Sequence, residues 1–388
     1  MTGASTPVVR VTPPPDLTSE SLEARRDSGE PFPIVDGDVC TFAFRGPAIA
    51  VRLVHFGVGL PDDLAFQPVG GSGCESADGD EWWMLGLRFP RGSRLEYKLE
   101  VTDSFGTRLI EDPLNQRTAS HPFGGNSVCE ADGYATPDWA ITRDDVPRGS
   151  IHDVVLGSAA LGRSTTTSVY LPAGYSPDPM HRAQLVVIHD GPDYVRFASA
   201  TTVLDNLIHG GILPPTVVAF LHVAERLVEY ADDARHHEFL TTELIPHLES
   251  ELAVGGEPSK RCLAGASFGA VASLSAATHA PGTFGRLLLQ SGSFAGAGVG
   301  CWPRPEALWR PIKRFVHAYL ADPAFVADRI YVTCGVYESL ICENRGIVPV
   351  LESTGMDVTF DESLDGHNWA SWRDRLGVAL PALLRPAG

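Results

Sequence analysis

Residues 261–279 read RCLAGASFGAVASLSAATH and contain the pattern GxSxG at positions 265–269. The run RCLAG is typical of a buried strand, and FGAVASLSAATH, with its small and apolar residues, is typical of a buried helix. Gly265 and Gly269 lack side chains, so a tight turn between them can pack closely and expose the hydroxyl of Ser267. This order of strand, serine turn and helix predicts a nucleophilic serine at a helix N-terminus. The alternative interpretation is a packing turn in which Ser267 only caps the helix.

The alternation of strand and helix continues on both sides of this motif, from about residue 151 to the end of the chain. Near-continuous apolar strands separated by helical segments predict a doubly wound, mainly parallel sheet with helices on both faces. With the GxSxG turn, the predicted fold class is α/β, of the α/β-hydrolase type. Segments 153–158 and 166–171 are expected to begin the sheet as an antiparallel pair. The predicted strands span 184–190, 216–223, 261–265, 286–290, 330–334 and 357–361, and the predicted helices span 199–209, 238–252, 268–279, 305–320, 339–352 and the residues from 369 onward.

The first third of the chain has a different pattern. Between about 38 and 110, short alternating runs are separated by Gly, Asp and Ser clusters with nothing helical between them, which is typical of a β-sandwich. We predict three parts: a flexible N-terminal arm at 1–30, an immunoglobulin-like (E-set) β-sandwich domain at 31–145, and an α/β-hydrolase domain at 150–388.

A serine hydroxyl is a weak nucleophile at neutral pH and needs a base within hydrogen-bond reach. In α/β-hydrolases the order along the chain is serine, acid and histidine. His367 follows the last predicted strand and precedes the final helix, so it satisfies this order as the base. Glu338, just past the strand 330–334, is the favoured acid, with Asp361 and Asp365 as the alternatives. A Ser–His pair with a weak third partner also stays open.

Hydrolysis of an ester also needs N–H donors directed at the developing oxyanion. The backbone N–H of Phe268, the residue after the serine, is one candidate. The other is expected in the loop HDGPDY after strand 184–190, where Pro192 has no N–H and the donor is therefore Gly191 or Asp193.

Two residues are predicted to contact substrate at the carboxyl edge of the sheet, where ligands of such folds bind. They are Arg226, after strand 216–223, and Asp193. Arg226 is interpreted either as a cleft arginine held by Glu229 or as half of a solvated ion pair with it.

The composition excludes some classes of binding partner. The 388 residues carry a formal net charge of −18, which argues against nucleic acid or an anionic membrane as the main partner. We find neither an apolar run long enough to span a bilayer nor a signal sequence, and the seven cysteines lack CxxC spacing. We therefore expect a cytoplasmic, reduced protein with buried free thiols at Cys262 and Cys334. We expect no cofactor and no metal site, because the adjacent side chains of His236 and His237 diverge on a helix and are interpreted as a solvated helix start.

The chain resembles the enterochelin (enterobactin) esterases, within the esterase D group of α/β-hydrolases. The resemblance covers about residues 38–385, and it lies in the motifs EDPLNQR, HDG, RLVEY, GASFGA, QSGSF, YVTCGVYE and GHNWASWRD. It implies a serine esterase acting on the trilactone backbone of a ferric catecholate siderophore. The same resemblance implies Ser267 as nucleophile, His367 as base, Glu338 as acid and Arg226 near the substrate. A small-molecule ester is thus the expected partner. A feruloyl- or acetyl-type esterase on carbohydrate esters and an acyltransferase on the same fold are the alternatives.

Overall fold

The computed structural model describes residues 8–70, 81–298 and 306–385, and the chain divides into two compact units. The first, here called the two-sheet unit, contains Met1–Ala135, Val336–Glu338 and Leu364–Asn368; the second, here called the eight-strand unit, contains Thr136–Gly335, Ser339–Ser363 and Trp369–Gly388. The division therefore falls earlier than the predicted boundary at 145–150. In addition, two short segments that the sequence assigned to the hydrolase domain pack within the two-sheet unit.

The two-sheet unit contains two antiparallel sheets. The first sheet consists of β1 (Val9–Val11), β2 (Ile34–Asp36), β3 (Val39–Gly46), β5 (Gln67–Pro68) and β6 (Glu81–Arg88). The second consists of β4 (Ala50–Val54), β7 (Arg94–Asp103), β8 (Gly106–Ile110), β9 (Thr118–His121) and β10 (Gly124–Glu130). Buried side chains of both sheets, such as Phe42 and Leu85 from the first and Leu53 and Leu99 from the second, form one hydrophobic cluster. The predicted immunoglobulin-like topology stays a prediction.

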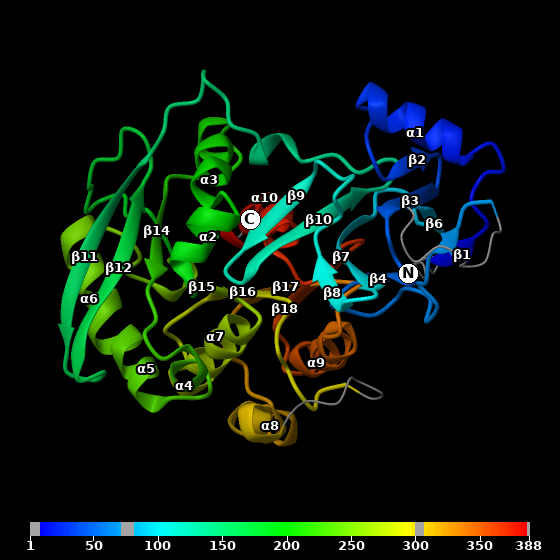
Figure 1. The fold of residues 1–388 in the computed structure, drawn as a ribbon. Helices are drawn as coiled ribbons and strands as arrows, with labels where there is room; N and C mark the ends of the chain where they lie inside the picture. The colour runs from blue at the N-terminus through cyan, green and yellow to red at the C-terminus, as the bar shows by residue number, and fades with distance from the viewer. Residues whose placement is uncertain (1–7, 71–80, 299–305, 386–388) are drawn as a thin grey trace. The chain divides into compact units, whose positions relative to one another are not determined.

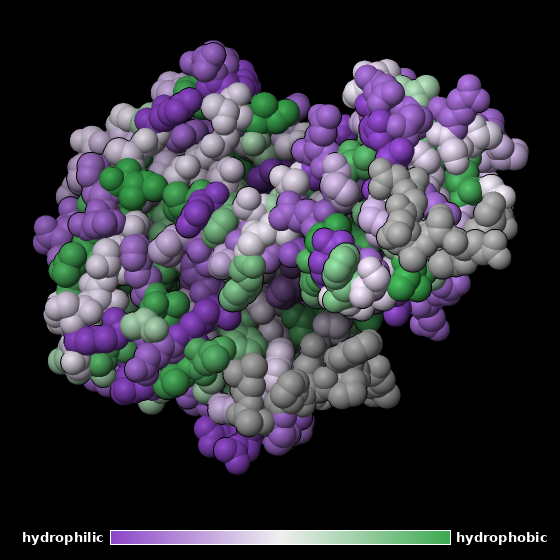
Figure 2. All heavy atoms as spheres, in the orientation of Figure 1, coloured by the Kyte–Doolittle hydropathy of each residue, from purple (hydrophilic) through white to green (hydrophobic). Residues whose placement is uncertain are grey.

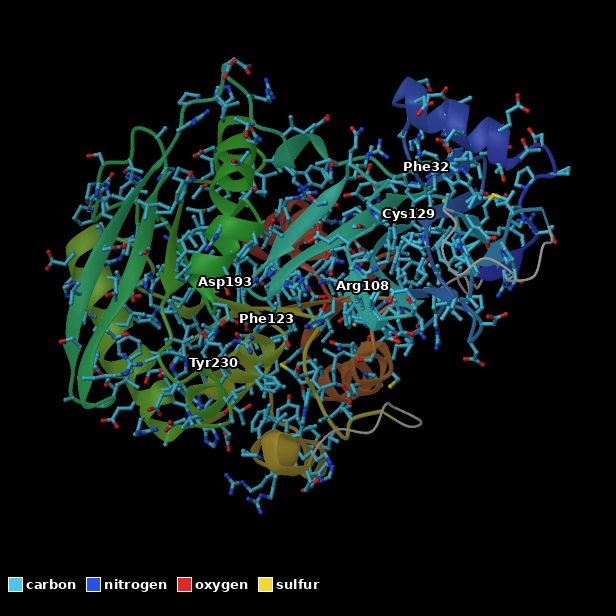
Figure 3. All side chains as sticks on the ribbon, in the orientation of Figure 1. Phe32, Arg108, Phe123, Cys129, Asp193 and Tyr230 are labelled. Atoms are coloured by element: carbon cyan, nitrogen blue, oxygen red, sulfur yellow. The ribbon has the colours of Figure 1, made fainter. Side chains whose placement is uncertain are left out.

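Within the predicted N-terminal arm at 1–30, the described residues from 8 onward form a strand and a helix. Strand β1 pairs with β6, and helix α1 (Ser19–Ser28) is capped by the Thr18 side chain. Leu22 of this helix is fully buried with Phe32 and Trp82, and Figure 3 labels Phe32 in this unit. A Pro-rich, charged composition is typical of disorder, because such a segment has few apolar side chains to bury. Here the burial of one apolar face offsets the conformational entropy that is lost when the segment is ordered.

The eight-strand unit contains the predicted mixed sheet (Figure 1). Its strand order is β11-β12-β14-β13-β15-β16-β17-β18; β11 and β12 are antiparallel to their neighbours, and the others are parallel. The strands are β11 (Ser150–Ser158), β12 (Arg163–Leu171), β13 (Gln184–Ile188), β14 (Thr216–Leu221), β15 (Arg261–Ala266), β16 (Arg286–Gln290), β17 (Arg329–Gly335) and β18 (Asp357–Ser363).

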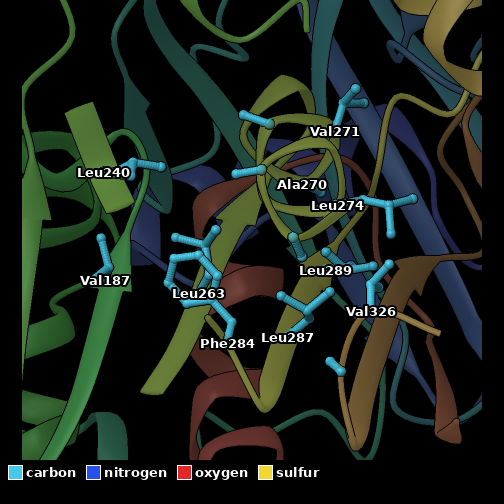
Figure 4. Close-up of a cluster of buried hydrophobic side chains, with 14 of the residues drawn as sticks. Val187, Leu240, Leu263, Ala270, Val271, Leu274, Phe284, Leu287, Leu289 and Val326 are labelled. Carbon is cyan, nitrogen blue, oxygen red and sulfur yellow. The ribbon is translucent and has the colours of Figure 1, made fainter. Parts of the chain in front are cut away.

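Helices cover both faces of this sheet, because alternate strand residues point to opposite sides and both sides are apolar. The helices are α2 (Gly191–Phe197), α3 (Ala200–His209), α4 (Arg226–Glu229), α5 (Ala234–Glu238), α6 (Ile245–Leu252), α7 (Phe268–His279), α8 (Glu306–Ala321), α9 (Ile341–Ser353) and α10 (Trp369–Leu384). Val187, Leu263 and Leu289 pack against α7 and its neighbours (Figure 4), whereas Val186 and Ala264 pack against α2, α3 and α10.

The predicted single helix at 238–252 is divided in the structure. Between α5 and α6, Phe239–Leu244 forms a π-helix, and Pro246 lies in the first turn of α6. Because proline has no N–H, it cannot continue the ordinary hydrogen-bond ladder, and the wider turn directly before it accommodates the interruption.

Among the described cysteines, Cys40, Cys129, Cys262 and Cys334 are buried free thiols, as predicted for the last two. Cys342, in contrast, is disulfide-bonded, so the expectation of a fully reduced chain is wrong at this position. No helix in the described ranges is long and apolar enough to cross a membrane. Hydrophilic and hydrophobic residues are interspersed over the visible face (Figure 2).

Candidate active site

Ser267 occupies a strained turn between β15 and α7. Its backbone has φ 58° and ψ −118°, a combination that non-glycine residues adopt rarely and that costs on the order of 1–3 kcal/mol. Two backbone hydrogen bonds hold this conformation: the Ser267 N–H donates to the Gln290 carbonyl (2.9 Å), and the Ser293 N–H donates to the Ser267 carbonyl (3.1 Å). The Ser267 Oγ lies 3.2 Å from the Oγ of Ser293. A serine held in this way presents its hydroxyl instead of folding it back as a helix cap, and no cap hydrogen bond from Ser267 is formed.

The two glycines of the GxSxG motif permit this turn by close packing. A Cβ at Gly265 would lie 2.4 Å from the Gly269 carbonyl carbon. A Cβ at Gly269 would lie 3.0 Å from the Cβ of His189. The motif therefore joins the turn after β15 to the end of the neighbouring parallel strand β13.

The two predicted oxyanion donors begin two helices at this edge of the sheet. Phe268 is the first residue of α7, and Gly191 is the first residue of α2. The first N–H groups of a helix have no acceptor within the helix, so both are available to an anion. Gly191 must be glycine, because a Cβ there would lie 2.3 Å from the Phe220 carbonyl carbon. The alternative donor, the N–H of Asp193, already donates to the Asp190 carbonyl.

Arg226 is held by Asp190 rather than by Glu229. Its Nε and Nη2 donate to the two carboxylate oxygens of Asp190 at 2.8 and 2.7 Å. The guanidinium lies 5.5 Å from the ring centroids of both Tyr230 and Phe268, and 38% of the side chain is exposed. Burial works to lower the pKa of Arg226, but Asp190 raises it overall. The arginine is thus fixed beside the residue that follows Ser267.

Both interpretations of an Arg226–Glu229 pair are therefore wrong. Glu229 is buried and accepts from Arg163 (2.7 Å) and from the N–H groups of Ala224 and Glu225. The position of Asp190 in the sequence is a signal for this pairing. Asp190 follows strand β13, and Arg226 follows the adjacent parallel strand β14. The carboxyl ends of adjacent parallel strands meet at one edge of the sheet.

Asp193 lies on α2, one turn from this pair, and is labelled with Tyr230 in Figure 3. Burial and the neighbouring charge of Asp190 raise its pKa. A carboxyl group in this position is a candidate for hydrogen bonding to a substrate, and its role stays a prediction.

His367 and Glu338 lie in the two-sheet unit and contact each other directly. The Nδ1 of His367 and the Oε2 of Glu338 are 2.5 Å apart. Glu338 is fully buried, whereas 31% of the His367 side chain is exposed. With the proton on Nδ1, the lone pair of the imidazole lies on Nε2, which is the arrangement that a catalytic triad uses. The pairing of Ser267 with His367 joins the two units and stays a prediction.

The two alternative acids have other partners. Asp361 accepts from Arg375 at 3.1 Å and from the Tyr331 hydroxyl at 3.5 Å. Asp365 accepts from Arg94, from Asn368 and from the N–H of Gly366. These contacts favour Glu338 as the carboxylate that orients His367.

His236 and His237 are both buried, so the interpretation as a solvated helix start is wrong, although their side chains do diverge. The Nε2 of His237 lies 2.9 Å from the Oγ of Ser275. Asp232, His237 and His279 could hold a metal ion, with ligand atoms within 4.8 Å of one another. However, Oδ1 of Asp232 already accepts from Ser275 and pairs with Nε2 of His279. These hydrogen bonds account for the cluster, and we assign it no metal.

His236 instead supports the serine turn through His189. The two Nε2 atoms are 3.0 Å apart, and Nδ1 of His189 is 3.1 Å from both the Ser273 Oγ and the Ala264 carbonyl. Burial lowers the pKa of His189 to about 4 and that of His236 well below its ordinary value. Both imidazoles are therefore neutral at physiological pH.

This burial predicts a loss of stability in acid. Between about pH 6.5 and 4, the unfolded chain binds a proton at His189 and the folded chain does not, so the free energy of unfolding falls as pH falls. For His189 the loss at pH 5 is about 2 kcal/mol. Asp112 and Asp365, whose pKa values burial raises to about 6, act in the opposite sense.

Urea unfolding of the wild type and His189→Gln at pH 7 and pH 5 separates these effects. The difference between the two proteins should shrink by about 2 kcal/mol at pH 5, because the variant no longer loses stability through this imidazole. A pH-independent difference would show that His189 is not held neutral by the fold.

Comparison with known proteins shows the family of this chain. Residues 158–383 match the family model Esterase, described as "Putative esterase". The iron(III) enterobactin esterase of Escherichia coli K12 is 25% identical over 310 residues, covering 76% of this chain and 72% of that protein. A crystal structure of the enterobactin esterase of Shigella flexneri, in the presence of enterobactin, aligns at 21% identity and TM-score 0.67 over 89% of this chain and 92% of that one. A ferulic acid esterase structure aligns at 19% identity and TM-score 0.52, covering 61% of this chain and 98% of that chain.

The solved structures share an α/β-hydrolase-type fold with the eight-strand unit, and the enterobactin esterases extend the likeness to most of the chain. The chain therefore belongs to the esterase family, and enterobactin esterases are among its relatives.

Proposed function

We propose that the protein is a serine esterase that cleaves carboxylic ester bonds through an acyl-enzyme on Ser267. The observation that carries this proposal is the strained backbone of Ser267 between β15 and α7. It supports a nucleophile because the turn exposes the hydroxyl beside two helix N-termini, those of Gly191 and Phe268. The His367–Glu338 hydrogen bond supplies the matching base and its orienting carboxylate.

The reaction then follows in two steps. The Nε2 of His367 takes the proton of Ser267 as its Oγ attacks the ester carbonyl carbon, and the N–H groups of Phe268 and Gly191 bind the resulting oxyanion. The protonated imidazole gives its proton to the leaving alkoxide, which departs as an alcohol. Water, activated by the same Nε2, cleaves the acyl-enzyme and restores the Ser267 hydroxyl.

The substrate we propose is the trilactone backbone of a ferric catecholate siderophore such as enterobactin. Support comes from relatives that are named iron(III) enterobactin esterases, and from the structural likeness to an enterobactin esterase over 89% of this chain. Arg226, fixed beside Phe268, leaves its Nη1 outside the pair with Asp190 and offers a cation to an anionic catecholate. We propose the cytoplasm as the place of action, in keeping with the free thiols of Cys40, Cys129, Cys262 and Cys334 and with the disulfide of Cys342 as an exception.

Product analysis by mass spectrometry tests both the reaction and the substrate. Wild type and Ser267→Ala are each incubated with ferric enterobactin, methyl ferulate and a short acetyl ester. We expect linear dihydroxybenzoylserine products from the wild type only. Turnover of methyl ferulate alone would favour the second candidate, a feruloyl esterase, which the ferulic acid esterase fold suggests. Turnover of none of the three esters would contradict the proposed hydrolysis.

A further inference from the structure

The segments that carry the proposed base and acid are attached to the two-sheet unit by backbone hydrogen bonds. The Arg94 N–H, at the start of β7, donates to the Leu364 carbonyl (2.8 Å), and the Val58 N–H donates to the Tyr337 carbonyl (2.9 Å). The two segments also bind each other, because the Tyr337 N–H donates to the Asp365 carbonyl (3.1 Å). A Cβ at Gly57 would lie 1.7 Å from the Tyr337 carbonyl oxygen, so this approach requires glycine.

A buried ion pair reinforces this attachment next to His367. The Arg94 side chain is 5% exposed and that of Asp365 is 6% exposed. Nη1 of Arg94 lies 3.4 Å from Oδ2 of Asp365 and donates to Oδ1 of Asn368 at 3.1 Å, while Nη2 donates to Glu96 at 2.9 Å. Arg94 therefore binds residues on both sides of the histidine in the sequence.

Asp365 in turn accepts hydrogen bonds from both sequence neighbours of His367. Its Oδ1 accepts from the Gly366 N–H (2.7 Å) and from the Asn368 side chain (2.7 Å). Burial raises the pKa of Asp365 to about 6, and the charge of Arg94 opposes this rise. Without Arg94 the carboxyl group would take up a proton near neutral pH and would lose acceptor strength.

A pocket of ≈50 Å³ shows that side chains of the second sheet lie beside the histidine. Its walls include Glu96 and Asn126 from the strands together with Tyr337 and His367. Nδ2 of Asn126 donates to Glu96 at 3.0 Å, so the chain of hydrogen bonds runs from β10 through Glu96 to Arg94.

We propose that Arg94 is a positioning residue for catalysis, which sets the orientation of His367 toward Glu338 through Asp365 and Asn368. This inference rests on the proposed function, since it assigns Arg94 a role in that same site. The two-sheet unit thus contributes to the chemical step, and not only to folding or substrate contact. The charge-assisted hydrogen bonds of Arg94 to Asp365 and Asn368 restrain the chain on both sides of His367. This restraint matters because misplacement of a catalytic group by about 1 Å can lower the rate about 100-fold.

The test compares two variants. Arg94→Met keeps the apolar part of the side chain and removes the charge, whereas Arg94→Lys keeps the charge but loses the branched N–H donors of the guanidinium. Tyr97→Phe is the matched control on the same strand. Its hydroxyl is buried and donates to Asp112 at 2.6 Å, so the variant also removes a buried hydrogen bond without touching the segments 336–338 and 364–368.

We expect Arg94→Met to lower kcat on p-nitrophenyl acetate by about 100-fold, with KM changed by less than about threefold. The kcat of Arg94→Lys should lie between those of Arg94→Met and the wild type. Tyr97→Phe should lower the Tm comparably while kcat stays within about twofold. Equal losses of kcat in Arg94→Met and Tyr97→Phe, or a kcat within twofold of wild type in Arg94→Met, would overturn the proposal.

A second readout does not depend on ester hydrolysis. The proton between His367 and Glu338 should give a far-downfield 1H NMR resonance, identified by its loss in His367→Ala. It should persist in Tyr97→Phe and shift or vanish in Arg94→Met. Retained activity in Ser267→Ala would contradict the proposed function. The resonance would still test the role of Arg94, because it reports the hydrogen bond between His367 and Glu338 and not ester hydrolysis. Should Arg94→Met not fold, Arg94→Lys and Asp365→Asn provide the same comparison, and an unchanged resonance in both would contradict the proposal.

Discussion

Replacing Ser267 with alanine is expected to reduce kcat by roughly 10⁴- to 10⁶-fold, because the triad acts as a unit and only binding and oxyanion contacts remain. The loss should appear in kcat with little change in KM. Ester turnover measured for wild type and Ser267→Ala under identical conditions gives the ratio. The same pair treated with a fluorophosphonate should show one added group on Ser267 in the wild type and none in the variant.

Ser275→Ala is the matched control for this substitution. Ser275 lies on the same helix, α7, and is buried, but its hydroxyl bonds to Asp232 rather than to the site. We expect its kcat to stay within about threefold of wild type. A variant Ser267→Ala with more than a tenth of the wild-type rate would exclude Ser267 as the nucleophile, leaving the family membership untouched.

Replacing His367 with alanine is expected to cost a similar factor, about 10⁴-fold or more, since no other group would accept the Ser267 proton. Glu338→Gln should cost less, about 10²-fold to 10⁴-fold, because an amide still hydrogen-bonds the imidazole but does not stabilise its charged form. Steady-state kinetics across pH, compared for the three proteins, measure both effects.

Asp361→Asn provides the matched change of carboxylate to amide. Asp361 pairs with Arg375 and not with His367, so its kcat should remain near that of the wild type. If Asp361→Asn lost more activity than Glu338→Gln, the acid would have to be reassigned despite the 2.5 Å contact of Glu338 with His367.

The glycine-rich and apolar parts of the sequence were sufficient to predict the eight-strand unit. The helix predicted at 268–279 is α7 without change, and each predicted strand overlaps an observed one. This succeeded because the period of apolar residues and the positions of glycine act locally, within one strand, turn or helix. The same local signals singled out Ser267, Phe268 and Gly191, each of which lies at the end of one such element, and their roles stay predictions.

Prediction failed where the partner of a side chain lies far away in sequence. Arg226 pairs with Asp190, 36 positions away, rather than with its neighbour Glu229. In the same way the motif EDPLNQR, which belonged to the family resemblance, provides Asp112 and Asn115 to hold the buried hydroxyl of Tyr97. Charge and motif spacing describe which groups are available, but burial decides which of them pair.

The sequence alone thus determined the order of strands and helices, the strained serine turn and the histidine after the last strand. Only the tertiary structure decided that Glu338 is the carboxylate in contact with His367, and that both lie on segments held by the two-sheet unit. The physical reason is that periodicity is a property of neighbouring residues, whereas an ion pair such as Arg94–Asp365 forms between positions 271 apart once both are removed from water.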